Sequence, residues 1–192
     1  GEKYADYMLK NVLQPLGMTQ SSFNQPPSSD KQNLLATGYN GKVEVVGKYH
    51  IYPEQAAAGL WTNPTDLAKY IIETQLSLQG KSNKILSKEM SIKRLDNNLG
   101  VFVQDYKGTK YFGHSGGNDG FVCHYIGSLE DGNGVVVMTN GRNMQLINEI
   151  VSNIAYQNHW KNYPFEPIKE SISLTIKKIA NQDIEKGIEL YK

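Results

Sequence analysis

Apolar side chains recur at helical spacing in several parts of the chain, and each of these parts is a predicted helix. The clearest runs from Pro64 to Leu78, where leucine, tyrosine and isoleucine residues mark one face. Asn63 is a favourable N-cap residue, Pro64 suits the first helical position, and Gly80 suits the end of a helix. The same pattern predicts helices at residues 2–13, 87–94 and 143–159, the first of which should end near Pro15-Leu-Gly-Met18. An apolar stripe on the last of these should lie against a sheet; it consists of Leu146, Ile147, Ile150, Val151 and Ile154.

Beyond residue 98 the helical period gives way to short apolar runs separated by turns, which predicts strands. The predicted strands cover residues 99–106, 110–114, 121–128 and 135–139. Successive strands joined by tight turns form an antiparallel meander, so the predicted fold class is α+β, a meander with packed helices. The continuous apolar run of the last strand predicts that both of its faces are covered. Residues 18–50 are polar and rich in Pro and Gly, which predicts a loop with one short strand pair.

The last part of the chain, after Tyr163-Pro164, has the pattern of one or two amphipathic helices. Their shared face consists of Ile168, Ile172, Ile176 and Ile179. This stripe is either a core face or a face that binds a partner. The predicted division is therefore a main domain at residues 1–160 and a helical tail at residues 161–192.

Composition and charge exclude several classes of protein. The chain has 39% hydrophobic and 20% charged residues, as ordinary globular proteins do. Its formal net charge of +1 gives no electrostatic reason to expect nucleic acid or an anionic membrane as a partner. Cys123 is the single cysteine, so no internal disulfide can form. No apolar run approaches the roughly 20 residues that span a bilayer.

Three stretches, in this order, carry a specific resemblance. They are Gln14-Pro-Leu-Gly-Met-Thr19 followed by Ser22-Phe23, then Ala56-Ala-Ala-Gly-Leu-Trp-Thr-Asn-Pro-Thr-Asp-Leu-Ala-Lys-Tyr70, then Gly113-His-Ser-Gly-Gly-Asn-Asp-Gly-Phe121. Together they resemble the C-terminal portion of the class C β-lactamase-like and penicillin-binding protein family, over about residues 2–160. The resemblance implies a serine hydrolase that acts by acyl transfer on amides or esters, with β-lactams or D-Ala-D-Ala peptides as typical substrates.

That family builds its site from Ser-x-x-Lys, Tyr-x-Asn and a strand motif that is Lys-Thr-Gly or His-x-Gly. His114, Ser115 and Gly116 match the His-x-Gly form. By resemblance, the Gly117 N–H is one oxyanion donor, and His114 faces the cleft, where it polarises the catalytic network or binds a substrate carboxylate. The two glycines would let a substrate approach the strand closely. The predicted site residues are therefore His114, Ser115, Gly116 and Gly117.

The other two motifs are absent from their expected place before Pro15. Ser28-Ser-Asp-Lys31 has no apolar flank that would bury the lysine, and Tyr156-Gln-Asn158 falls inside a predicted helix. We interpret both as chance matches. The chain is thus expected to be part of a longer protein that carries the nucleophile helix and the N-terminal strands upstream, and to be inactive alone.

The remaining candidate residues have simple interpretations. No cofactor or metal is predicted, because His124 and Cys123 have no further ligands at metal spacing. Asp66 fits the first turn of a helix better than the role of a general acid. Trp61 and Tyr49 either line the mouth of the cleft or pack in the core.

Two functions of other classes remain open. One is a module that binds a peptidoglycan-like ligand without turnover. The other is a structural fragment that forms a homodimer through an unfinished sheet edge. The expected partners are a small-molecule or peptide substrate and no nucleic acid. A parent protein outside the cytoplasm, in the periplasm, in the extracellular space or anchored to a membrane, is implied by the resemblance alone.

Overall fold

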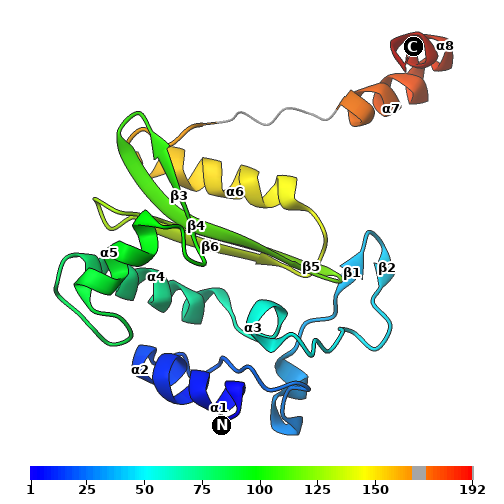
Figure 1. Ribbon diagram of the computed structural model, residues 1–192. Coiled ribbons are helices and arrows are strands. Elements are labelled where there is room, and N and C mark those ends of the chain that lie inside the picture. The colour runs from blue at the N-terminus through cyan, green and yellow to red at the C-terminus, as the bar shows by residue number, and fades with distance from the viewer. Residues whose placement is uncertain (166–171, 192) are drawn as a thin grey trace.

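A four-stranded antiparallel sheet forms the centre of the fold (Figure 1). The computed structural model describes residues 1–165 and 172–191, with side chains in the second range described for residues 176–189. The strands follow one another in the order β3-β4-β5-β6. Their bounds are β3 Phe102–Tyr106, β4 Thr109–Asn118, β5 Phe121–Ser128 and β6 Gly134–Thr139. The predicted α+β class and the antiparallel meander are confirmed, and β4 is longer than predicted.

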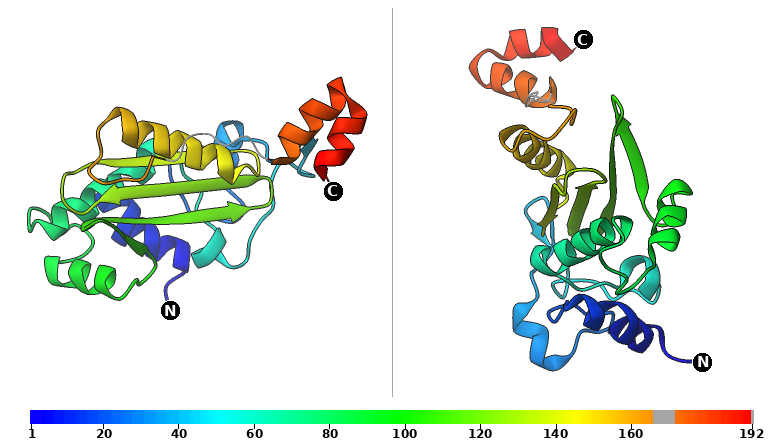
Figure 2. Two further views of the ribbon diagram at one scale, coloured as in Figure 1. Left: turned by 90° about the horizontal axis from the view of Figure 1, so that it is seen from above. Right: turned by 90° about the vertical axis from the view of Figure 1, so that its left-hand side faces the viewer.

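Helices cover both faces of this sheet. The helix α6 (Met144–Gln157) lies on one face, and α4 (Pro64–Leu78) and α5 (Lys88–Asp96) lie on the other (Figures 1 and 2). Val137 belongs to the core on the α6 side and Val136 packs into the core on the α4 side. The prediction that both faces of this strand are covered is therefore confirmed.

Each face has its own hydrophobic core. On the α6 side the buried residues are Tyr111, Ile126, Val137, Ile147, Val151, Ala155 and Trp160. On the other side they are Ile71, Leu95, Val101 and Phe112. The predicted stripe on α6 is correct for Ile147, Ile150, Val151 and Ile154. It is wrong for Leu146, which is 43% exposed because it lies at the rim of that face.

The first helix ends within the predicted stretch from Pro15 to Met18. The α1 segment (Tyr4–Met8) continues through a π-helical turn, Leu9–Leu13, into α2 (Gln14–Leu16) and ends at Gly17 with φ 68°. Pro15 sits in the first turn of α2, where its missing N–H is tolerated. The buried residues of this region are Leu13, Leu16, Met18 and Phe23.

The connection from α2 to α4 contains short elements. The predicted strand pair is present as β1 (Tyr39–Asn40) and β2 (Val43–Glu44). A 3₁₀ helix (Ser29–Leu34) and the one-turn helix α3 (Gln55–Ala58) were not predicted. Both are too short to show a hydrophobic period.

Helix α4 begins and ends as predicted. The Asn63 side chain accepts a hydrogen bond from the Asp66 amide at 2.9 Å, and Gly80 adopts φ 70° just after the last turn. At the end of the chain, α7 (Ile172–Gln182) and α8 (Ile184–Tyr191) pack against each other. Ile168 and the side chain of Ile172 lie outside the described residues, and the division after residue 160 stays a prediction. In the part of the chain that the structure describes, no helix is both long and apolar enough to cross a bilayer.

Candidate functional site

One edge of β4 is open beside the predicted site. Strand β3 begins at Phe102, which pairs with Gly113, whereas β5 pairs with β4 as far as Asn118. Residues 114–118 therefore have a strand on one side only, among the residues that the structure describes. An open edge presents unpaired backbone N–H and C=O groups to whatever approaches it.

The direction of these backbone groups follows from the ladder. The Leu129 amide donates to the Lys110 carbonyl at 3.0 Å, so Lys110 lies at a hydrogen-bonded position opposite β5. Hydrogen-bonded and non-hydrogen-bonded pairs alternate along an antiparallel ladder. Even-numbered residues of β4 therefore direct their N–H and C=O groups toward β5. Ser115 and Gly117 direct theirs to the open edge.

His114 lies where β3 stops. Its ring is exposed and stacks on Phe102, with ring centroids 5.3 Å apart and an interplanar angle of 21°. Its Nδ1 atom lies 2.5 Å from the Ser115 carbonyl oxygen, one of the groups directed to the open edge. The imidazole is thus beside the open edge and outside both hydrophobic cores.

The glycines of the motif differ in the space around them. A Cβ atom on Gly113 would lie 2.5 Å from the Tyr125 carbonyl oxygen, and one on Gly116 would lie 2.9 Å from Cys123 Sγ. A Cβ on Gly117 would meet nothing closer than a Val122 methyl group at 3.8 Å. The first two positions exclude side chains for reasons of packing. Gly117 has room for one, so its backbone stays open to a ligand.

Ser115 and His124 face each other across β4 and β5. Ser115 Oγ lies 2.9 Å from His124 Nδ1, and burial lowers the pKa of His124. Burial raises the pKa of the neighbouring Cys123 thiol, with partial compensation from the Gly116 backbone, which disfavours a reactive thiolate. The sequence alone did not identify this Ser–His pair.

The turn after β4 is held by distant segments. Asn118 Nδ2 donates to the Ala58 carbonyl at 3.0 Å, which joins the second motif to the third. The Asp119 amide donates to the Tyr52 hydroxyl at 2.9 Å, and the Asp119 carboxylate lies 3.6 Å from His50. Residues 37–52, here called the arm, therefore fix the end of the open edge.

The arm also packs tightly on this turn. Gly120 has φ 78°, and a Cβ on it would lie 2.5 Å from a Val45 methyl group and 2.7 Å from Gly38 Cα. A Cβ on Gly38 would lie 2.6 Å from the Phe121 ring, which fills the space that a side chain would need. A side chain on Gly120 would displace the arm, and one on Gly38 would displace the arm or the Phe121 ring.

Asp66 joins the first motif to the second. Its carboxylate is buried and accepts hydrogen bonds from Ser21 Oγ at 2.9 Å and from the Gln20 amide at 2.8 Å. Lys69 Nζ lies 2.7 Å from the other oxygen. Burial alone would raise the pKa of Asp66, but the bonds from Lys69, Ser21 and Gln20 outweigh it, and the pKa is lowered. The sequence placed Asp66 at the start of a helix but gave no sign of these partners.

Asp66→Asn is expected to remove part of the acid sensitivity of folding. The unfolded carboxyl has the higher pKa, near 3.9, so as the pH falls it binds a proton first and acid favours unfolding. The stabilisation by Asp66 is therefore present above about pH 4 and is lost as the pH falls through the lower, folded pKa. Urea midpoints from pH 2 to pH 7 should fall less steeply with acid in the variant. If the urea midpoints of Asp66→Asn and of the unmodified protein fall equally with acid, this role of Asp66 is contradicted.

The chance motif matches lie on the surface. Ser28 is exposed beside the 3₁₀ helix that holds Lys31, and Tyr156 is 57% exposed on α6. In the described part of the chain, no three His, Cys, Asp or Glu side chains gather closely enough to hold a metal ion. Trp61 packs edge-on against Tyr49, with ring centroids 4.8 Å apart.

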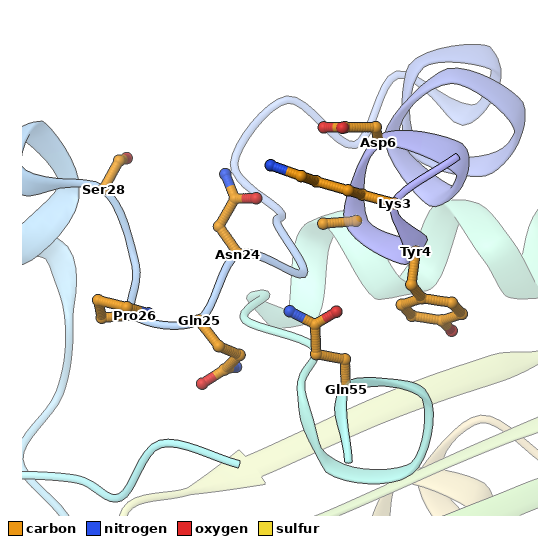
Figure 3. A pocket seen from close by; sticks show the side chains of 9 residues that line it. Lys3, Tyr4, Asp6, Asn24, Gln25, Pro26, Ser28 and Gln55 are labelled. Atoms are coloured by element: carbon orange, nitrogen blue, oxygen red, sulfur yellow. The ribbon is translucent and has the colours of Figure 1, made fainter. Parts of the chain in front are cut away.

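A polar pocket of about 560 Å³ lies elsewhere, between α1 and the loop that follows α2. It is lined by Lys3, Tyr4, Ala5, Asp6, Asn24, Gln25, Pro26, Ser28 and Gln55 (Figure 3). None of the predicted site residues contributes to its wall. The open edge of β4 and this pocket are therefore separate features.

Comparison with known proteins gives a consistent result. The sequence model of the beta-lactamase family matches residues 1–149. Beta-lactamase-like protein 1 of Dictyostelium discoideum is 35% identical over 74 residues, which are 36% of this chain and 12% of that protein.

Solved structures share the fold. The octameric penicillin-binding protein homologue from Pyrococcus abyssi is similar with a TM-score of 0.63 and 22% identity, over 94% of this chain and 42% of that one. The D-amino acid amidase from Ochrobactrum anthropi SV3, complexed with L-phenylalanine amide, is similar with a TM-score of 0.64 and 19% identity, over 84% of this chain and 53% of that one. The chain thus spans about half the length of these proteins or less.

Proposed function

The chain belongs to the beta-lactamase family, and on this basis we propose that it forms one wall of the acyl-transfer site of a serine hydrolase. The proposed reaction is the cleavage of an amide or ester through an acyl-enzyme. In this site a substrate lies along the open edge of β4. The backbone N–H of Gly117 binds the oxyanion, and His114 lies beside the reacting groups.

One observation carries this proposal. Gly117 directs its N–H to an edge that has no strand partner in the described part of the chain, in a strand whose turn is fixed by the arm and by Ala58. Oxyanion stabilisation needs donors that are already in place before the charge develops. A strand whose turn is held in this way meets this requirement better than a free loop does.

We propose that the nucleophile comes from a segment encoded before residue 1. Ser28 is the only serine that stands three residues before a lysine, and its exposure argues against it. The chain covers 42% and 53% of the length of the two structural neighbours, which supports the same proposal. By itself the chain would then be inactive toward such substrates.

The substrate class is proposed from the chemistry of relatives. The amidase neighbour was solved with an amino acid amide, and the other neighbour is a penicillin-binding protein homologue. Small amides, β-lactams and D-Ala-D-Ala-like peptides are therefore the first candidates. The dimer stays a prediction; its basis is that β6 pairs with β5 alone among the described residues.

Fluorescent penicillin tests this function. The product of the whole gene should form a stable covalent adduct on an upstream serine, and the 192-residue chain should remain unlabelled by penicillin. Reversible binding without an adduct in the whole product would favour the non-catalytic binding module. Penicillin labelling of the 192-residue chain would contradict the upstream nucleophile.

A further inference from the structure

A hydrogen-bonded serine and histidine lie on the α6 side of the sheet, and the proposed function does not use them as a pair. Ser115 and His124 are register partners on β4 and β5, with Ser115 Oγ 2.9 Å from His124 Nδ1. Ser115 is exposed and His124 is partly buried. A hydroxyl in contact with an imidazole is the basic arrangement of an activated nucleophile.

The protonation of this imidazole follows from its surroundings. Burial is the largest influence and lowers the pKa of His124, so the ring is neutral at pH 7. A hydrogen bond with the His114 backbone acts in the opposite direction, as a carbonyl that accepts an imidazole N–H does. A neutral imidazole has one N–H and one acceptor nitrogen. If the carbonyl takes the N–H, Nδ1 is left to accept the proton of Ser115.

We propose that Ser115 is a second reactive serine in this chain, with His124 as its general base. The proposal further requires that Nε2 of His124 donates to the His114 backbone carbonyl, which would complete the sequence of nucleophile, base and orienting group. The N–H of Ser115 itself faces the open edge and would supply an oxyanion donor. The site would take small activated esters and phosphonyl fluorides, because Ser115 is exposed and these reagents need little binding surface to react.

A fluorophosphonate would react with Ser115 by substitution at phosphorus. Ser115 Oγ attacks phosphorus, the P–O bond forms, and the P–F bond breaks with departure of fluoride. The hydroxyl proton passes to Nδ1 of His124 and then to water. No other reactant is needed, and the adduct is stable enough to be located by mass spectrometry.

Labelling of the 192-residue chain with a fluorophosphonate probe, followed by peptide mapping, tests the proposal. The adduct should be on Ser115, and His124→Phe should slow its formation by about 100-fold, the scale of general-base catalysis. Ser28→Ala is the matched control, since Ser28 is also an exposed serine but does not belong to the Ser115–His124 pair, and it should leave the rate unchanged. Absence of an adduct on Ser115, or an equal rate in His124→Phe, would overturn the proposal.

A second measurement does not depend on any variant being folded. Long-range ¹H–¹⁵N NMR spectra of the unmodified chain report which imidazole nitrogen carries the proton. The proposal requires the Nε2–H form of His124, and a dominant Nδ1–H form would refute it. Both measurements are independent of an upstream nucleophile, so failure of penicillin labelling in the whole product would leave this proposal standing.

Discussion

Gly117→Pro is expected to slow acylation of the whole gene product by penicillin by about 10²–10³-fold, the usual cost of losing one oxyanion donor. Proline lacks the N–H, and it is tolerated on a strand edge where that N–H faces away from the ladder. Gly117 satisfies this condition because its N–H is directed to the open edge. Stopped-flow or gel-based labelling rates would measure the effect.

Gly117→Ala is the matched control for this substitution. It retains the N–H, and its Cβ would meet only a Val122 methyl group at 3.8 Å, an ordinary contact. Its acylation rate should therefore stay within a few-fold of the unmodified protein. If alanine and proline slow the reaction equally, the strand contributes shape alone and the backbone donor is not used.

Tyr111→Ala is expected to have the largest effect on folding, a loss of about 3–5 kcal/mol in the free energy of unfolding. The side chain is fully buried and stacks on Trp160, with centroids 5.8 Å apart and an interplanar angle of 9°. Its hydroxyl donates to the Lys161 carbonyl at 2.7 Å. Burial, with the nearby Asp131 and Glu130, raises its pKa to about 12, so the phenol remains a neutral donor.

Urea unfolding of Tyr111→Ala and Tyr111→Phe separates packing from hydrogen bonding. Phenylalanine keeps the ring and loses only the bond to Lys161, which should cost about 1 kcal/mol. Similar losses in the two variants would mean that the hydrogen bond dominates. The packing of the Tyr111 ring against Trp160 would then contribute little to the free energy of unfolding.

Much of the fold was accessible from the sequence because local signals agreed with the tertiary structure. Helix α4 is the clearest case, since Asn63, Pro64 and Gly80 mark its ends and its apolar face is buried. Strand β4 was predicted too short, because the residues from Ser115 to Asn118 have weak strand propensity. Leu146 was misplaced because a periodic pattern cannot identify the rim of a buried face.

The candidate site was predictable only in part. The sequence identified His114 and the glycines through a motif, but the open edge depends on where β3 begins, and no local pattern marks that point. The pairing of Ser115 with His124 depends on register. One signal was present: Asp119-Gly120 is a typical two-residue hairpin turn, and it sets Ser115 opposite His124. Two partners of the Asp66 carboxylate, Ser21 and Gln20, are 45 and 46 residues away, beyond the range of any local pattern.

The arm has a consequence for the order of folding. Its bonds reach far along the chain, since Asn40 contacts Asp119 across 79 positions and Asn140 contacts Thr37 across 103. Closing such long loops costs entropy before the contacts repay it, so segments of this kind join late. The arm can form its contacts with the turn only after the hairpin of β4 and β5 has formed. The open edge of β4 therefore acquires its final rigidity in one of the last steps on the route to the native state.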